Sequence, residues 1–364
     1  MKLPLPPNPN RITDANAHLV RYHAQCGRWG HVPVMLAWHP RQPLLATGST
    51  LDHTQLRDAT VWTPEGRLSA RMPGTCGLVD LGWSWDGRWL ATATDRIILW
   101  TEDAQQVRTI PGQLLGWNPA SYHLTTYARQ DGRWRIWDLV GGTIQRLDHP
   151  PTPIQWRTRL FWSPRGTYLA GCWRVPNGAV TLMVWDRTGR SILNTALKRP
   201  QRGEVVGCLW HPRERHLLLW LHEEIIVVDL HGSVINVLPI SSNFGGWNDS
   251  TPYQWSTDGA VLAASTESTV QLWTESGHPQ TTLNLPGEAL SVAWNPAGDV
   301  LATAAWHNQI QLWTRDGDHI TDLIIQQPGL GGAAMQIPFL LAWDATGQYL
   351  AASLRGCTVH LWGL

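Results

Sequence analysis

One pattern recurs eight times along the 364 residues of this chain. In each copy a short apolar run ends in Trp, a turn follows three to five residues later, and an apolar pair such as Leu-Ala comes next. The eight tryptophans are Trp38, Trp83, Trp117, Trp162, Trp210, Trp255, Trp294 and Trp343. Their mean spacing is near 44 residues, and a Trp-marked period of about 40 to 45 residues is typical of the blades of a β-propeller.

A second mark closes a β-rich run later in each copy. It is Val228 in the fifth copy and Trp in the other seven, at Trp62, Trp100, Trp137, Trp185, Trp273, Trp313 and Trp362. After most of these residues a turn contains Gly, as in WTPEG and WDRTG, where Gly supplies the positive φ of a tight hairpin. Each copy is therefore expected to be a meander of short strands, and eight copies predict eight blades.

The segment VAWNPAGDVLATAAWHNQIQLWTRDG resembles the repeat of the WD40 family in spacing and residue type. The resemblance extends over roughly residues 15 to 364. It implies an all-β, eight-bladed β-propeller in which each copy supplies strands a, b and c of one blade and strand d of the next. Seven blades is the alternative, because seven is the commoner number in that family and the fifth copy lacks its second Trp. The family's tetrad of hydrogen-bonded His, Ser or Thr, Asp and Trp is largely missing.

The two ends of the chain are expected to close the ring. The eighth copy stops at Leu364 after its third strand, which would leave an unpaired edge. An N-terminal strand around residues His18 to Tyr22 is expected to complete that last blade. Residues 1–14 are expected to form an extended Pro-rich arm, and residues 15–364 a single propeller domain. The arm lacks the apolar region of a secretion signal, and no stretch of 18 apolar residues predicts a membrane span.

The sequence contains no recognisable motif for catalysis, cofactor binding or metal binding. There is no G-x-S-x-G elbow, no P-loop and no H-E-x-x-H. The five cysteines have no close pairs, which favours reduced thiols in the cytoplasm over a disulfide framework or a zinc site. The fifteen histidines are scattered, and His39 and His211 fall in turns, so structural roles are expected. We therefore predict a noncatalytic, cytoplasmic protein without cofactor or metal.

Charge divides the chain into sectors although its net value is zero. Residues 155–215 hold eleven basic side chains against three acidic ones, whereas residues 216–364 hold thirteen acidic side chains against two basic ones. On a closed ring this places a basic sector across blades 4 and 5 beside an acidic sector. Such a field steers and orients partners, and the alternative is a chance sorting of solvated turn charges.

Tryptophan points to the same basic sector. Nine of the 24 tryptophans lie outside the two repeated positions, and Trp and Arg are enriched at interface hot spots. Segments between blades and between strands b and c are expected to share the face that WD40 proteins generally use for partners. The predicted partner-binding residues there are Trp156, Arg157, Arg159, Trp173, Arg174, Arg199, Arg202, Trp247 and Trp306. For each Trp, packing between blades is the alternative.

The predicted function is a noncatalytic protein-interaction scaffold that docks one or more proteins, for which an acidic surface would suit the basic sector. The first alternative is binding of RNA or single-stranded DNA through the Arg/Trp sector of blades 4 and 5, although a pI near 7.3 lacks the basic excess of a dedicated nucleic-acid binder. The second alternative is a ligand-binding or hydrolytic propeller, which would need polar groups converging at the strand starts in the central channel.

Overall fold

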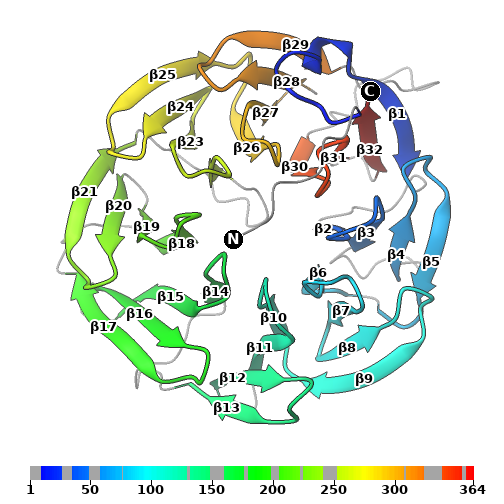
Figure 1. Cartoon of the computed structure of the whole chain (residues 1–364), viewed down its shortest axis with the longest axis vertical. Helices are drawn as coiled ribbons and strands as arrows, with labels where there is room; N and C mark the ends of the chain where they lie inside the picture. The colour runs from blue at the N-terminus through cyan, green and yellow to red at the C-terminus, as the bar shows by residue number, and fades with distance from the viewer. Residues whose placement is uncertain are drawn as a thin grey trace.

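The computed structural model describes residues 10–26, 35–48, 58–75, 77–128, 132–147, 160–175, 179–197, 205–221, 224–240, 252–306, 309–323, 338–354 and 358–364. Their strands form eight four-stranded antiparallel sheets that are arranged as blades around a ring (Figure 1). The predicted eight-bladed propeller is confirmed, and the fifth blade is complete. Within these ranges the one helical element is the short 3-10 helix η1 (Ala17–Leu19), and no helix is long and apolar enough to cross a membrane.

The first four blades each take four consecutive strands, from the centre of the ring outward. Blade 1 contains β2 (Met35–Trp38), β3 (Leu45–Gly48), β4 (Ala59–Trp62) and β5 (Leu68–Met72). Blade 2 contains β6 (Asp80–Trp83), β7 (Leu90–Ala93), β8 (Arg96–Trp100) and β9 (Gln106–Pro111). Blade 3 contains β10 (Leu114–Trp117), β11 (His123–Ala128), β12 (Arg133–Asp138) and β13 (Ile144–Arg146). Blade 4 contains β14 (Leu160–Trp162), β15 (Tyr168–Arg174), β16 (Val180–Asp186) and β17 (Ser191–Leu197).

The next three blades follow the same rule, and the eighth takes its outer strand from the other end of the chain. Blade 5 contains β18 (Val205–Trp210), β19 (His216–Leu221), β20 (Glu224–Asp229) and β21 (Val234–Pro239). Blade 6 contains β22 (Tyr253–Trp255), β23 (Val261–Thr266), β24 (Thr269–Thr274) and β25 (Pro279–Asn284). Blade 7 contains β26 (Ala289–Trp294), β27 (Val300–Ala305), β28 (Gln309–Thr314) and β29 (His319–Leu323). Blade 8 contains β30 (Pro338–Trp343), β31 (Tyr349–Leu354), β32 (Thr358–Gly363) and β1 (Arg21–Cys26).

In the first seven copies the fourth strand belongs to the same blade as the three strands before it. In blade 1, for example, β5 pairs with β4. The expectation that this strand would join the next blade is wrong. The reason is local, because a tight turn with Gly66 at φ +75° joins β4 to β5 and keeps the two strands as hairpin neighbours.

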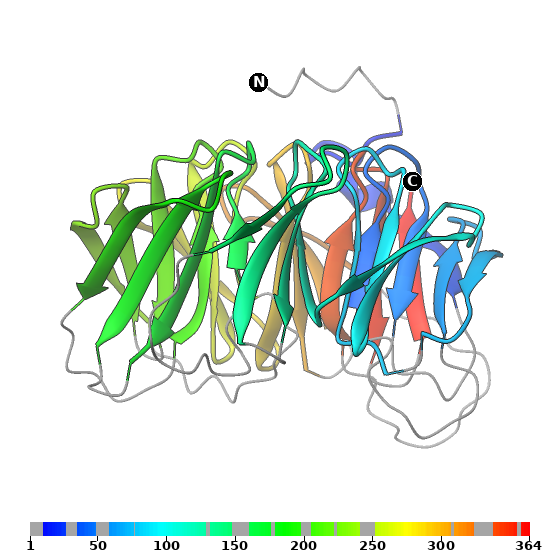
Figure 2. The same cartoon turned by 90° about the horizontal axis from the view of Figure 1, so that it is seen from below.

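The two faces of the ring carry different connections between strands. Tight turns join the first strand to the second and the third strand to the fourth, and they gather at one face, here called the turn face (upper side of Figure 2). The second strand of each blade ends, and its third begins, at the opposite face, here called the loop face. The innermost strands also begin at the loop face and run toward the turn face.

The N-terminal strand closes the ring, as predicted. β1 pairs antiparallel with β32, with Arg21 opposite Gly363 and Cys26 opposite Val359. The strand covers Arg21–Cys26, which places it slightly later in the sequence than the expected His18 to Tyr22, because His18 lies in η1.

Ile12 strengthens this closure on the turn face. Its backbone N–H donates to the carbonyl of Gly347 in blade 8 at 2.7 Å, and its own carbonyl accepts from Asn295 Nδ2 in blade 7 at 2.9 Å. Its side chain is fully buried in the apolar cluster between these blades, with Val300 and Leu350. The described part of the predicted Pro-rich arm therefore bridges two blades.

The core lies between the blades. The buried apolar residues of the described ranges fall into eight clusters, and each cluster joins one pair of neighbouring blades. At six of these boundaries the indole N–H of the first repeat Trp also donates to a carbonyl in the innermost strand of the preceding blade, at 2.9 to 3.1 Å. The donors are Trp38, Trp83, Trp117, Trp162, Trp210 and Trp343.

The second repeat Trp bonds within its own blade. In blades 1, 2, 3 and 7 its indole N–H donates to a Thr hydroxyl on the adjacent strand, as Trp313 does to Thr303 at 2.9 Å. The tetrad was expected to be largely missing, and part of it is present as Trp–Thr pairs. In blade 6 the matching position holds Ala264, and the indole N–H of Trp273 has no hydrogen-bond partner within the described residues.

Candidate functional site

Six of the nine predicted partner-binding residues lie outside the described residues, so the structure does not test them. They are Trp156, Arg157, Arg159, Arg199, Arg202 and Trp247. The strands on either side of these segments, such as β13 and β14, end and begin at the loop face.

The other three predicted residues differ in their surroundings. Trp173 in β15 is 7% exposed and packs with Trp134 and Trp162 between blades 3 and 4, so for this residue the packing alternative holds. Arg174 ends the same strand at the loop face and is half-buried. Trp306 follows β27 at the loop face, is half-buried, and its backbone N–H donates to Glu288 O at 2.9 Å.

The basic sector is divided between the two faces. Five of its described arginines lie in turns of the turn face, and Arg174 lies at the loop face. The five are Arg165, Arg187, Arg190, Arg213 and Arg215. The loop face therefore receives a smaller share of the described positive charge than the sequence count implies. On the turn face, Arg215 forms an ion pair with Glu275 at 2.7 Å.

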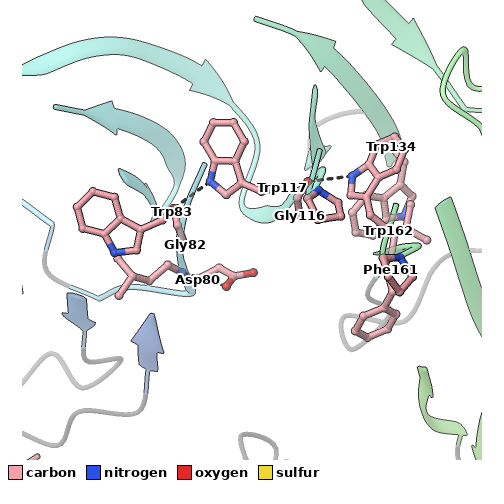
Figure 3. A pocket seen from close by; sticks show the side chains of 12 residues that line it. Asp80, Gly82, Trp83, Gly116, Trp117, Trp134, Phe161 and Trp162 are labelled. Atoms are coloured by element: carbon pink, nitrogen blue, oxygen red, sulfur yellow. Dashed lines mark hydrogen bonds between the residues drawn. The ribbon is translucent and has the colours of Figure 1, made fainter. Parts of the chain in front are cut away.

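A pocket opens in the central channel beside blades 2, 3 and 4 (Figure 3). Its volume is about 450 Å³. The innermost strands β6, β10 and β14 line it from Asp80 and Leu160 at their starts to Pro119 and Pro164 just beyond their ends. The remaining lining residues are Leu81, Gly82, Trp83, Gly116, Trp117, Trp134, Phe161 and Trp162.

Two glycines lie in the wall of the pocket. Gly82 and Gly116 occupy the position before the repeat Trp, which is filled by Phe161 in blade 4 and by Leu209 in blade 5. Their carbonyls accept the indole N–H groups of Trp117 at 2.9 Å and Trp162 at 3.1 Å, the dashed lines of Figure 3. The same two residues therefore hold the blades together and leave room between them.

The pocket is chemically an aromatic cavity with few polar groups. Among its described lining residues the one charged side chain is Asp80, whose Oδ1 accepts the N–H of Leu81 at 2.9 Å. The indole N–H of Trp134, a side chain 3% exposed, has no hydrogen-bond partner within the described part of the chain. Such a pocket suits an apolar or aromatic group. It offers neither the ligand set of a metal site nor a paired acid and base.

Three side chains between blades 5 and 6 lie close enough together to resemble a metal site. Ligand atoms of His211, His216 and Glu275 all lie within 4.8 Å of one another. However, both ring nitrogens of His211 are engaged, because Nδ1 accepts the N–H of Arg213 at 3.1 Å and Nε2 donates to Gly259 O at 3.0 Å. Glu275 is paired with Arg215. This geometry assigns His211 a hydrogen-bonding role between blades.

His39 has the same role between blades 1 and 2. Its Nδ1 accepts from Arg41 N and Gln42 N, and its Nε2 donates to Gly87 O at 3.2 Å. Burial lowers the pKa values of His39 and His211, which favours the neutral rings that these bonds require.

A sequence signal for these contacts exists. The residue after the first repeat Trp alternates along the eight copies as His39, Ser84, Asn118, Ser163, His211, Ser256, Asn295 and Asp344. His39, Asn118 and His211 each reach the turn glycine of the following blade, Asn118 donating to Gly166 O at 2.9 Å. Asn295 reaches Ile12 instead. The alternation therefore marks residues that join blades.

Comparison with known proteins agrees with this architecture. The family model described as "WD domain, G-beta repeat" matches residues 277–314, a stretch that contains the outer strand β25 of blade 6 and the first three strands of blade 7. A search of curated protein sequences gives no match.

Three solved structures share the fold. Sqt1 of Saccharomyces cerevisiae superposes with a TM-score of 0.73 at 11% identity, covering 94% of this chain and 99% of that one. Sqt1 of Chaetomium thermophilum, solved bound to the N-terminus of ribosomal protein L10, gives 0.75 at 15% identity, with 94% and 99% covered. The C-terminal WD40 domain of Sif2 gives 0.69 at 14% identity, with 95% and 98% covered.

The architecture and these likenesses agree at each level. The ring of eight four-stranded sheets is closed by an N-terminal strand, residues 277–314 match the family's repeat model, and Sqt1 and the WD40 domain of Sif2 superpose over nearly the whole ring. The chain is an eight-bladed β-propeller that shares its fold with a WD40 domain and contains a match to the WD40 repeat.

Proposed function

We propose that this propeller is a noncatalytic scaffold of the cytoplasm that docks an extended segment of a protein partner along its central channel and loop face. The aromatic pocket beside Gly82 and Gly116 is the observation that carries the proposal. Free, buried thiols at the described cysteines Cys26, Cys172 and Cys208 fit a reducing compartment.

The pocket has the size and chemistry to hold one apolar or aromatic side chain of such a segment. Its volume of about 450 Å³ lies within the usual range of ligand pockets, and Trp83, Trp117, Trp134 and Trp162 are among its lining residues. Because Asp80 is the one charged side chain among the described lining residues, apolar contact is proposed to dominate binding of that side chain.

The surrounding frame is rigid, which favours binding. Trp117 and Trp162 fix the two blade boundaries that meet at the pocket, through their bonds to Gly82 and Gly116. A preformed site loses little conformational entropy when a partner binds.

The rest of the partner is proposed to extend over the loop face, where an acidic stretch would meet the basic sector. The residues proposed to contact it are Trp156, Arg157, Arg159, Arg174, Arg199, Arg202, Trp247 and Trp306. The Chaetomium Sqt1 structure, which holds the N-terminus of ribosomal protein L10, is a precedent on the same fold for docking a terminal protein segment.

Filling the pocket tests the proposal. A Cβ at Gly116 would lie 3.5 Å or more from its neighbours, so Gly116→Ala is accommodated, whereas Gly116→Leu adds a side chain at the pocket wall. We expect Gly116→Leu to reduce partner recovery in affinity purification with quantitative mass spectrometry by at least tenfold, and Gly116→Ala to leave recovery near the wild-type level.

A charge-reversal variant separates the channel from the loop face. Replacing Arg157, Arg159 and Arg174 together by Glu is expected to remove partner recovery while leaving the thermal unfolding temperature unchanged. Wild-type recovery with both Gly116→Leu and the triple variant, in proteins that unfold normally, would refute the scaffold site proposed here.

A further inference from the structure

We propose a second docking site, on the turn face over blades 1 to 3, that binds an acidic peptide segment. It consists of Trp85, Trp89 and Tyr122 with the guanidinium groups of Arg41 and Arg88, here called the turn-face cluster. It lies on the face opposite to the loop face and is independent of the channel pocket.

The aromatic part of the turn-face cluster is held in place by two neighbouring blades. Trp85 and Trp89 flank the turn between β6 and β7, and Tyr122 comes from the corresponding turn of blade 3. The ring of Tyr122 lies 5.8 Å from that of Trp85 and 5.0 Å from that of Trp89. Its hydroxyl donates to Asp86 in the same turn of blade 2, so the three rings form one unit.

The turn that carries the two tryptophans is itself fixed. Gly87 has φ +82°, and the Cβ of any other residue there would fall within 2 Å of the His39 ring. Ser84 Oγ accepts the N–H of Trp89 at 3.0 Å and donates to Asp86 Oδ1 at 2.9 Å. The cluster is therefore preorganised, which lowers the entropic cost of binding.

Packing of the propeller does not require Trp85. Five of the eight copies have Pro at this position, two residues after the first repeat Trp, and the other two have Thr257 and Ala345. These blades form the same turn with small residues. The indole is an addition specific to blade 2, and it stays partly exposed.

Two arginines give the turn-face cluster its charge. The guanidinium of Arg41 lies over the ring of Trp85 at 5.3 Å, and that of Arg88 lies over Trp89 at 5.2 Å. Both residues are exposed, and neither is in an ion pair within the described ranges. A guanidinium stacked on an aromatic ring keeps its N–H groups in its own plane, where they can form paired bonds with a carboxylate.

The acidic side chains near the turn-face cluster, Asp86 and Glu102, already accept other hydrogen bonds. Asp86 already accepts bonds from Tyr122, Ser84 and the N–H of Arg88, and these bonds lower its pKa against the opposing effect of burial. Glu102 accepts from Gln42 at 3.3 Å.

An acidic peptide fits this arrangement better than a nucleic acid does. Bases bind by stacking on open aromatic faces, and here the arginines cover one face of each Trp. The exposed guanidinium groups favour carboxylates, and Trp, Tyr and Arg are the residues most enriched at protein hot spots.

Fluorescence anisotropy with the full chain tests the inference. The probe is a fluorescein-labelled 12-residue peptide of Asp and Glu with a single central Leu. We expect micromolar binding that weakens as NaCl rises, and a loss of at least tenfold in affinity in the double variant Arg41→Glu, Arg88→Glu. Trp85→Pro, which installs the residue of five other copies, is expected to weaken binding by a similar factor.

Two controls distinguish this site from general charge and from the channel. Arg165→Glu with Arg213→Glu makes the same charge change at exposed turn-face positions of blades 4 and 5 and should leave affinity unchanged. Gly116→Leu should also leave it unchanged, so failure of the channel proposal would not affect this result. No peptide binding, an equal loss in the control pair, or tighter binding of a dT12 oligonucleotide that needs Arg41 and Arg88 would each overturn the inference.

Discussion

Two parts of the ring join neighbouring blades in different ways. At six boundaries the first repeat Trp both packs and donates its indole N–H to the preceding blade, as Trp210 does to Phe161 O at 2.9 Å. At the boundaries between blades 5 and 6 and between blades 6 and 7, Trp255 and Trp294 are equally buried, but their indole N–H groups have no partner within the described residues. The repeat therefore keeps the shape of Trp even where its hydrogen bond is absent.

Other contacts occupy those two boundaries. Between blades 5 and 6, Trp220 stacks on Tyr253 with ring centres 4.5 Å apart, and the rings of His211 and His216 lie 5.0 and 5.7 Å from Trp255. Between blades 6 and 7, the backbone N–H of Trp294 donates to Gln254 Oε1 at 2.6 Å. Aromatic packing and a side-chain amide thus take the place of the indole bond.

The largest expected difference concerns pH. His216 occupies the position that Leu44 has in blade 1. Burial is the largest of the effects that lower the pKa of His216 to about 4. The charges of His211 and Arg215 also contribute to this shift, and that of Glu275 opposes it. In the unfolded chain the His216 ring takes up a proton near pH 6.5, whereas in the folded chain it does so near pH 4. The contribution of His216 to the free energy of unfolding is therefore highest above pH 6.5 and falls as the pH drops toward 4. Between pH 7 and pH 5 we expect a loss on the order of 1 to 2 kcal/mol from this residue.

Denaturation with urea at both pH values measures this loss. His216→Leu, which copies blade 1, should remove that share of the pH dependence, while replacement of exposed His278 by Gln should not. An unchanged pH dependence in His216→Leu would show that His216 does not make the ring sensitive to pH.

The next prediction measures the contribution of the indole hydrogen bond to stability. Trp210, Trp255 and Trp294 are 3%, 5% and 3% exposed, so replacement of each by Phe removes a similar volume. Trp210→Phe also leaves Phe161 O without its donor and should cost about 1 kcal/mol more than the other two changes. Chemical denaturation of the three variants measures this, and equal losses would mean that the bond adds nothing to the packing.

The smallest expected effect concerns the second repeat Trp. Ala264→Ser would place a hydroxyl at the position from which Thr303 accepts the Trp313 indole in blade 7, and we expect a gain of roughly 0.5 kcal/mol. Thr303→Val should cause a loss of the same order. Thermal unfolding of both variants checks the pair, and a destabilised Ala264→Ser would show that blade 6 is packed too tightly to accept the hydroxyl.

The fold could be predicted from the sequence because its signal is repeated. One degenerate copy, with Val228 for Trp, did not obscure the period, and the fully buried Val228 fills the same place in blade 5. The blade to which the fourth strand belongs was predicted wrongly. The repeat shows which strands exist, but a local turn decides which of them pair.

The candidate site was much less predictable. The pocket is lined by Gly82 and Gly116 from the innermost strands of neighbouring blades, a relation that no linear spacing displays. Trp85 was counted among the surplus tryptophans, but the contacts with Arg41 and Tyr122 that give it a role come from two other blades. Trp173, predicted as a contact residue, is buried because the ring places it opposite Trp134.

The pairing of β1 with β32 also has a consequence for synthesis. Arg21 is made long before Gly363, its partner across the sheet, and at about 5 to 20 residues per second the intervening chain takes roughly 20 to 70 seconds to emerge from a ribosome. During that time β1 has open hydrogen-bonding groups while seven blades are formed beside it. Among the described strands of the propeller, β1 is translated before the others and pairs with the one translated last, so β1 is the strand most exposed to chaperones and to misassembly with a second nascent copy.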